Sequence, residues 1–88
     1  MEVVFLKRKF KFVMTEHVRQ RMVLREISLN MIVDVIESGI VMKKSEENKY
    51  WVYKSISGRS DNAVSLSIAV EGPTLVVITA LVNWRTYP

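Results

Sequence analysis

The hydrophobic residues of this chain change their spacing at Gly39, and this change limits the folds that the chain can adopt. Before Gly39, four aliphatic residues recur at i, i+3, i+4 and i+7, the spacing of one helical face. They are Leu29, Ile32, Val33 and Ile36. After Gly39, the stretches IVMKK, KYWVYKSI, AVSLSIAV and TLVVITALV are β-branched, aromatic or alternating, with polar turns between them. The sequence therefore predicts a helix over residues 29–38 followed by three or four strands.

The N-terminal part predicts one further strand and one further helix. In VVFLKRKFKFV, Phe10 and Phe12 alternate with Lys9 and Lys11, so a strand is expected from about residue 5 to 13. Thr15 is a suitable cap for a helix over residues 16–26. We therefore expect one α+β domain over residues 1–88: an N-terminal strand, two helices and a three- to four-stranded antiparallel meander. The apolar last strand should be central, with the helices covering one face.

Positive charge is concentrated near the N-terminus. The net charge of the chain is +4, and residues 1–25 hold seven basic and two acidic side chains. A positive electrostatic field on one side of a molecule favours binding to a phosphate backbone or to an acidic partner protein. Such a field is also common in proteins whose surface charge keeps them soluble. Both interpretations stay open.

Composition excludes several classes of protein. The chain has no cysteine and one histidine, so a disulfide framework or a conventional zinc site cannot form, and we expect no metal and no cofactor. Its apolar runs are shorter than the roughly 18 residues that a membrane span requires. We therefore expect a cytoplasmic protein that does not enter a membrane.

The stretch TEHVRQRMVLREIS spaces His17, Arg21 and Arg25 four residues apart. On a helix these residues form a row along one border of the apolar stripe made by Val18 and Met22. Solvated cations more often lie opposite the buried stripe. The row is therefore either a structural feature or the working surface of a site.

Arginines beside a buried edge need partners, because burying an unpaired guanidinium costs several kcal/mol. Asp34 or Glu37 of the second helix could supply a carboxylate, and a bound phosphate is the alternative. Arg25 lies nearer the apolar stripe and Arg21 lies next to His17. We accordingly predict a structural role for Arg25 and a functional one for Arg21.

The same stretch, together with IVDVIESGIV and a final apolar strand, resembles a bacterial family of small uncharacterised proteins described only as a domain of unknown function. The shared signature reads T-x-H-x3-R-M-x2-R-x-I, and the resemblance covers roughly residues 10–84. That family is similar in organisation to RelE/BrnT-type ribonuclease toxins. Glu26 stands where the family usually has glycine, so the junction between the helices is expected to differ slightly.

The resemblance implies a RelE/BrnT-like fold and a metal-independent endoribonuclease, the toxin of a type II toxin-antitoxin pair that cleaves RNA through the 2′-hydroxyl. His17 would act as base or acid, with Arg21 and Arg25 as phosphate and transition-state clamps. Lys9 and Lys11 would position the RNA backbone. The implied partners are RNA, including ribosome-associated RNA, and an acidic antitoxin protein.

Two aromatic stretches of the sequence could contact a nucleic acid. Trp84, Arg85 and Tyr87 follow the last strand and are candidate substrate-binding residues, since aromatic faces stack on any base. An aromatic lid over the core is the alternative. In KYWVY, Tyr53 should share a face with Trp51, and we interpret this stretch as core and sheet surface in preference to a nucleic-acid platform.

A noncatalytic interaction module is the rival class of function. In that case the helical pair or an exposed strand edge would bind a partner protein or a second copy of the chain, and the arginines would anchor salt bridges. The enzyme hypothesis requires His17, an arginine and the basic strand to converge on one surface. The module hypothesis requires only an apolar patch or a free edge.

Overall fold

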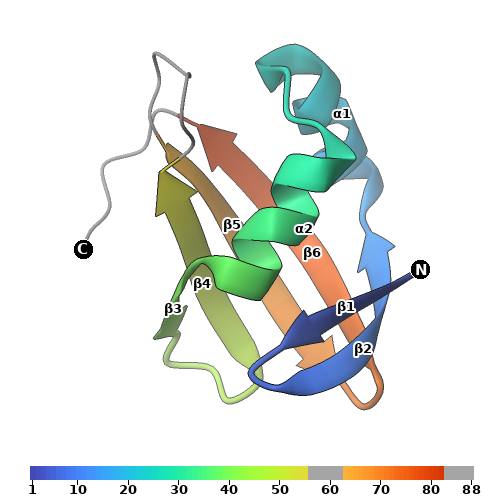
Figure 1. Ribbon diagram of the computed structural model, residues 1–88, viewed down its shortest axis with the longest axis vertical. Coiled ribbons are helices and arrows are strands. Elements are labelled where there is room, and N and C mark those ends of the chain that lie inside the picture. The colour runs from blue at the N-terminus through green and yellow to red at the C-terminus, as the bar shows by residue number, and fades with distance from the viewer. Residues whose placement is uncertain (56–62, 83–88) are drawn as a thin grey trace.

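The computed structural model describes residues 1–55 and 63–82, and in this part of the chain two helices pack against one six-stranded sheet (Figure 1). In chain order the elements are β1 (Glu2–Phe5), β2 (Arg8–Met14), α1 (Glu16–Arg25), α2 (Leu29–Ser38), β3 (Ile40–Lys43), β4 (Lys49–Ser55), β5 (Ala63–Glu71) and β6 (Thr74–Val82). The predicted α+β class is confirmed, as are both helices and the meander that follows them.

The strand order is β1-β2-β6-β5-β4-β3, which places the apolar strand β6 in the interior of the sheet, as expected. Strands β3 to β6 form the predicted antiparallel meander. The sheet as a whole is mixed, because residues 11–14 of β2 pair in parallel with residues 74–77 of β6. Two helices and three strands lie between these partners in the sequence, so no short turn forces them to be antiparallel.

The segment predicted as one strand over residues 5–13 is in fact an antiparallel hairpin. Phe5 of β1 pairs with Arg8 of β2, which leaves Leu6 and Lys7 as a two-residue turn. Both turn residues have positive φ, 51° and 67°, as a type I′ turn requires. Such turns normally contain Asn-Gly or Asp-Gly. Because this chain has leucine and lysine there, its sequence carries no local turn signal.

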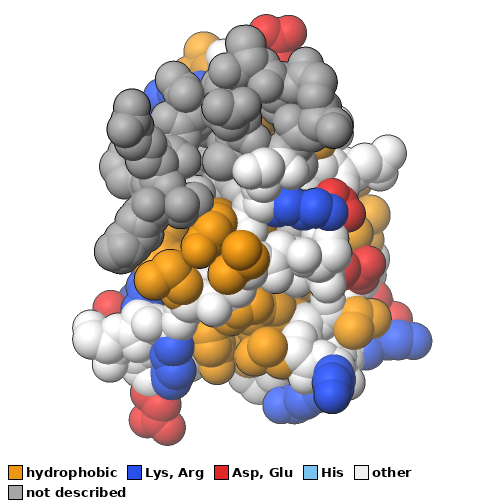
Figure 2. All heavy atoms as spheres, turned by 60° about the vertical axis from the view of Figure 1, so that its left-hand side comes forward, with side chains coloured by type: hydrophobic (Ala, Val, Ile, Leu, Met, Phe, Trp, Pro, Cys, Tyr) orange, Lys and Arg blue, Asp and Glu red, His pale blue; other side chains and the backbone are white. Residues whose placement is uncertain are grey.

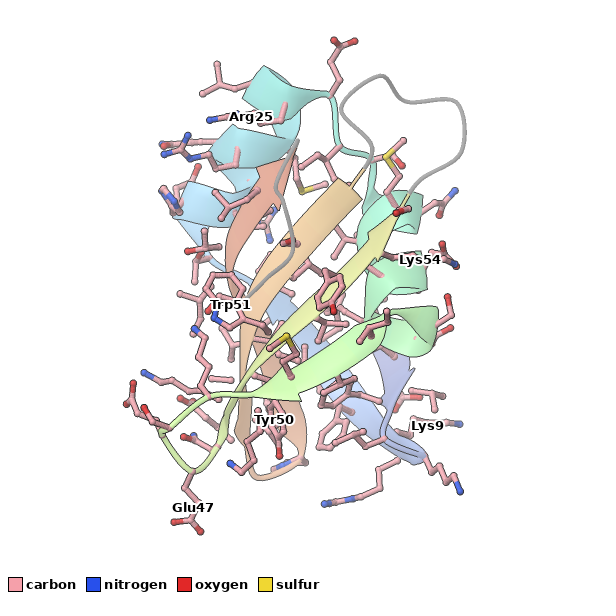
Figure 3. The ribbon with its side chains drawn as sticks, turned by 90° about the vertical axis from the view of Figure 1, so that its left-hand side faces the viewer. Lys9, Arg25, Glu47, Tyr50, Trp51 and Lys54 are labelled. Carbon is pink, nitrogen blue, oxygen red and sulfur yellow. The ribbon has the colours of Figure 1, made fainter. Side chains whose placement is uncertain are left out.

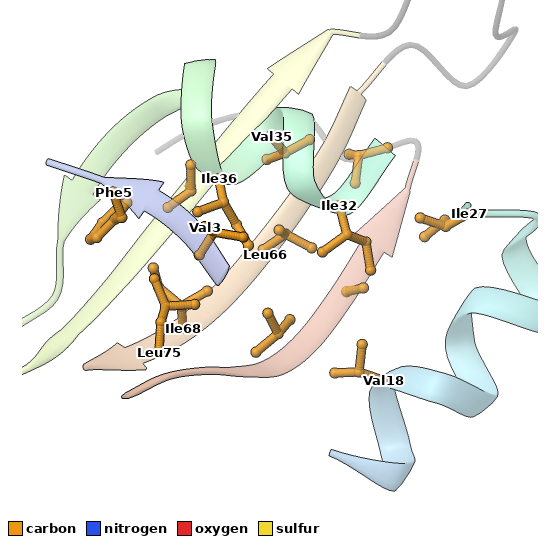
Figure 4. Close-up of a cluster of buried hydrophobic side chains, with 14 of the residues drawn as sticks. Val3, Phe5, Val18, Ile27, Ile32, Val35, Ile36, Leu66, Ile68 and Leu75 are labelled. Atoms are coloured by element: carbon orange, nitrogen blue, oxygen red, sulfur yellow. The ribbon is translucent and has the colours of Figure 1, made fainter. Parts of the chain in front are cut away.

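The hydrophobic core lies between α2 and one face of the sheet (Figures 1 and 4). The Ser28 hydroxyl caps α2 by accepting a hydrogen bond from the Met31 N–H, at 3.1 Å. The sheet and α1 contribute Val3, Phe5, Phe10, Val18, Val52, Val64, Leu66, Ile68, Leu75 and Val77 to the core. The helical stripe that faces them consists of Ile32, Val35 and Ile36, while Val33 is only partly buried.

The sheet curls so that distant strands meet beneath α2. The ring centroid of Phe5 lies 6.4 Å from that of Phe10 and 5.3 Å from that of Tyr50 on β4. Three strands separate β1 from β4 in the sheet order, so this contact requires strong curvature. Glu37 of α2 also accepts a hydrogen bond from the Val4 N–H, at 2.9 Å. One face of the sheet is thus closed over the core, and the other points away from α2.

The junction between the helices turns at Glu26, where the family resemblance suggested a glycine. Glu26 adopts a left-handed conformation, with φ 53° and ψ 46°, and its N–H donates to the Met22 carbonyl oxygen at the end of α1. Ile27 follows and is buried. Because the chain turns sharply at Glu26, α2 begins at Leu29 and packs across the sheet.

Candidate functional site

Thr15 fixes the start of α1 against β6. Its hydroxyl accepts a hydrogen bond from the Val18 N–H at 3.3 Å and donates one to the Ile78 carbonyl oxygen at 3.2 Å. The Thr15 N–H donates to the Val77 carbonyl oxygen, also at 3.2 Å. Val18 is fully buried, and Met22 packs against the core one turn later. The face of α1 beside these two residues therefore has a fixed position.

The helical row of His17, Arg21 and Arg25 lies on successive turns of α1. His17 and Arg25 are exposed, whereas Arg21 is partly buried. This order differs from the expectation that Arg25 lies nearest the buried edge. Since α1 ends at Arg25, its last turn is the outermost, and Val23 and Leu24 are 79% and 73% exposed there. Arg21 is therefore the most buried cation of the row.

The two carboxylates of α2 that could have paired with the arginines bind other groups. The Lys54 ammonium lies 2.7 Å from an Asp34 carboxylate oxygen, and the Ser38 hydroxyl donates to the other oxygen at 3.1 Å. These two hydrogen bonds, with the charge of Lys54, lower the pKa of Asp34. Glu37 accepts the hydrogen bond from the Val4 N–H. Both carboxylates thus hold α2 against β4 and β1.

Arg21 and His17 do not share in these contacts of α2. Within residues 1–55 and 63–82, neither side chain forms a hydrogen bond or an ion pair. A partly buried guanidinium without a counter-charge is unfavourable, and a bound anion would relieve this. An imidazole one turn away could move a proton at such an anion. The pair is therefore chemically suited to a phosphate ester.

The predicted basic strand does not join the helical row in one cluster. Figure 3 shows Lys9 at the opposite end of the molecule from Arg25. The Lys9 side chain is 69% exposed, with its ammonium 4.0 Å from the Glu2 carboxylate. Lys11 is exposed on the same strand. The remaining predicted contacts lie outside the described residues: Trp84, Arg85 and Tyr87.

A second group of side chains lies on the sheet face that points away from α2. Trp51 of β4 is paired with Ser67 of β5, and both side chains point opposite to the buried Val52 and Leu66. Lys44, just after β3, places its ammonium 4.4 Å from the Trp51 ring centroid and 2.5 Å from the Ser67 hydroxyl oxygen. Partial burial lowers the pKa of Lys44. We call Lys44, Trp51 and Ser67 the Trp51 cluster.

The positions of Trp51 and Ser67 in this cluster could be predicted from the sequence, but that of Lys44 could not. Tyr53 shares a face with Trp51, as predicted, whereas Tyr50 faces the other side and contacts Phe5 in the core. The strict alternation in AVSLSIAV places Ser67 on the face opposite the apolar core positions. Lys44 was missed, because its contact with Ser67 joins residues 23 positions apart.

Membrane-spanning helices and metal sites are both absent from the described residues. Across residues 1–55 and 63–82, no helix has the length and apolar character needed to cross a membrane. In the same ranges, no three His, Asp or Glu side chains are grouped so that they could hold a metal ion.

Comparison with known proteins places the domain in a family. A family model with the description "Domain of unknown function" matches residues 14–82, from the end of β2 to the end of β6. No curated protein and no solved structure matches the chain. The matched range is well over half of the chain and includes both the helical row and the Trp51 cluster. The chain therefore belongs to the family Domain of unknown function (DUF4258).

Proposed function

We propose that this domain is a metal-independent endoribonuclease, the toxin of a type II toxin-antitoxin pair, acting on RNA in the cytoplasm. The proposal rests on the environment of Arg21. Arg21 is a partly buried residue one turn beyond His17, and it has no carboxylate partner among the described residues. A phosphodiester would supply the missing counter-charge next to an exposed imidazole. The resemblance of the row to a family organised like the RelE/BrnT-type toxins supports the same activity.

The chemistry requires only proton transfer and stabilisation of negative charge. The ribose 2′-oxygen attacks the adjacent phosphorus and gives its proton to a base, while the bond from phosphorus to the 5′-oxygen breaks. The leaving 5′-oxygen takes a proton, so the products carry a 2′,3′-cyclic phosphate and a 5′-hydroxyl. His17 serves as the base or the acid. Arg21 and Arg25 donate hydrogen bonds to the phosphate oxygens as their charge increases.

The positive N-terminal segment contributes to RNA binding at a distance. Lys9 and Lys11 are exposed on β2, and Lys9 lies far from Arg25 (Figure 3). These lysines therefore contact phosphates elsewhere along the bound strand. Their effect should be on affinity and its salt dependence, with little effect on the cleavage step.

The proposal predicts cleavage that depends on His17 and Arg21 and needs no metal. Purified protein in excess chelator should cut total or ribosome-bound RNA and leave 2′,3′-cyclic phosphate ends. His17→Ala should slow cleavage by about 100-fold or more, and Arg21→Ala by a similar factor. Arg19→Ala is the matched control, because exposed Arg19 carries the same charge on another face of α1. Its cleavage rate should stay near that of the wild type.

Urea denaturation of the same variants separates a catalytic arginine from a structural one. Breaking a buried ion pair lowers the free energy of unfolding by about 3–5 kcal/mol. Arg21→Ala should lose far less than this, because the α2 carboxylates bind other groups. The proposal is wrong if folded wild-type protein cuts no RNA, or if Arg19→Ala loses as much activity as Arg21→Ala. It is also wrong if activity disappears when metal is removed.

A noncatalytic protein-interaction module is the second candidate function. The edge strands of the sheet are β1 and β3, and Figure 2 shows hydrophobic side chains gathered over β3 and β4. Ile40 of β3 is 59% exposed there. An edge strand offers backbone hydrogen bonds to a partner strand, and the net charge of +4 favours an acidic partner such as an antitoxin. Growth arrest on induced expression, relieved by a neighbouring gene product, would favour the toxin.

A further inference from the structure

Small hydroxyl side chains form part of the sheet face that points away from α2. Ser65 and Ser67 of β5 are 3% and 5% exposed, although both point away from the hydrophobic core. Ser67 bonds to Lys44, whereas the Ser65 hydroxyl has no hydrogen-bond partner in the described part of the chain. Buried hydroxyls nearly always have a partner. Ser65 therefore indicates a place where a ligand could complete the hydrogen bonding.

An aromatic ring and a cation lie next to these hydroxyls. Trp51 is only partly buried, and the ammonium of Lys44 occupies the space above its ring. Lys44 stands in the turn that follows β3, and its side chain is only partly buried. A long side chain in that position can leave the ring without disturbing a strand. Burial, and after it the nearby charge of Lys49, lowers the pKa of Lys44.

We propose that the Trp51 cluster, with Ser65, is a stacking site for one unpaired nucleobase of single-stranded RNA. The base stacks on the Trp51 ring after the Lys44 ammonium moves from the ring to an adjacent phosphate. The Ser67 hydroxyl, released by Lys44, then bonds to the edge of the base, and Ser65 lies two residues away on the same face of β5. Aromatic rings bind unstacked bases in this way with little sequence preference, and a neighbouring cation binds the backbone. This inference rests on the proposed function and names a contact for its substrate.

The position of the cluster agrees with a strand of RNA that also reaches the helical row. Figure 3 shows Trp51 on β4 and Arg25 on α1 pointing to the same side of the molecule, whereas Lys54 points toward α2. The helical row would hold the phosphate that is cut, and the cluster would hold a base farther along the same strand.

The inference predicts that a short single-stranded RNA with 2′-O-methyl riboses binds over Trp51. This probe has no free 2′-hydroxyl, so it reports binding in the absence of cleavage. The fluorescence that is lost in Trp51→Phe is the contribution of Trp51, and the probe should quench this contribution. Trp51→Leu should weaken binding of the labelled probe by about 5- to 100-fold, while Trp51→Phe, which keeps an aromatic face, should retain most of the affinity.

Salt dependence tests the role of Lys44. Lys44→Met should lower the slope of log affinity against log salt by about one unit, because one phosphate contact is lost. Lys54→Met is the matched control: it removes the same charge from a side chain that points toward α2, away from Trp51 (Figure 3), and should leave the slope unchanged. The quenching of tryptophan fluorescence in the wild-type protein and the salt slope of Lys44→Met test the stacking site even if Trp51→Leu fails to fold.

The outcomes distinguish this inference from the proposed function. Trp51 fluorescence that the probe does not quench overturns the stacking site, as does an unchanged affinity in folded Trp51→Leu. If the probe binds with the expected dependence on Trp51 but the protein cuts no RNA, the stacking site stands and the ribonuclease proposal fails. If RNA is cut equally well by wild-type protein and Trp51→Leu, with equal probe affinity, only the stacking site fails.

Discussion

At the scale of single residues, Glu26 stands in a conformation that side chains usually avoid. A residue with a Cβ atom in the left-handed region is destabilised by roughly 1–2 kcal/mol relative to the right-handed one. Glycine has no such penalty, and for this reason it is the commonest residue after the end of a helix. The backbone of Glu26 nevertheless has the geometry of a helix end, with its N–H donating to Met22.

Glu26→Gly should therefore stabilise the domain. We expect a gain of about 0.5–1 kcal/mol in the free energy of unfolding, because the greater freedom of glycine in the unfolded chain offsets part of the relief. Urea denaturation measures the change. Glu16→Gly, at the start of α1, should instead lower stability by about 0.5–1 kcal/mol. A loss of stability in Glu26→Gly would contradict the strain argument.

Residue spacing alone could not order the cations of α1 by burial. The positions of His17, Arg21 and Arg25 beside the apolar stripe follow from the helical repeat. Which of them is most buried depends on where α1 ends relative to β6, and the helical repeat contains no information about that. The sequence therefore located the row correctly but placed Arg25, and not Arg21, nearest the buried edge.

At the scale of secondary structure, local signals predicted some elements and missed others. The end of α2 followed from Gly39 and its course from a strong apolar period, and the start of α1 followed from Thr15. The hairpin was missed because Leu6 and Lys7 are not typical turn residues. The pairing of β2 with β6 was missed for a different reason: residues far apart in the sequence pair without any local pattern. The similarity to RelE/BrnT-type toxins remains a prediction.

The β1-β2 turn should gain stability from the residues that its geometry prefers. Replacing Leu6 by Asn and Lys7 by Gly should raise the free energy of unfolding by about 1 kcal/mol, since both positions have positive φ. Urea denaturation measures the gain, and slower amide hydrogen exchange in β1 should accompany it. A double alanine variant at the same positions removes the side chains but keeps both Cβ atoms, so it should give no gain. Equal stability of the two double variants would show that the turn is unstrained.

At the scale of the whole molecule, the curvature of the sheet depends on a few aromatic contacts. Phe5 is 2% exposed and joins β1 to β2 through Phe10 and to β4 through Tyr50. A small domain has a net stability of only about 5–15 kcal/mol, so a buried side chain that joins three strands accounts for a large fraction of it.

Phe5→Ala should lower the free energy of unfolding by about 3–5 kcal/mol, because it removes a buried ring and leaves a cavity below α2. Leu6→Ala is the neighbouring control, and since Leu6 is 55% exposed, its effect should stay within about 0.5 kcal/mol. Urea denaturation monitored by circular dichroism measures both. A Phe5→Ala loss as small as that of Leu6→Ala would mean that the Phe5 contacts do not hold the curled sheet together.

The place of β6 between β2 and β5 also determines when the sheet can be completed during synthesis of the chain. A ribosome makes β2 and α1 long before β6, and until β6 leaves the exit tunnel the nascent sheet has a gap at its centre. Thr15 has no backbone partner for its N–H in that state, because the partner is Val77. The helical row is thus assembled only when the last described strand is added. In the ribonuclease proposed above, the helical row would therefore stay incomplete until that strand has been made.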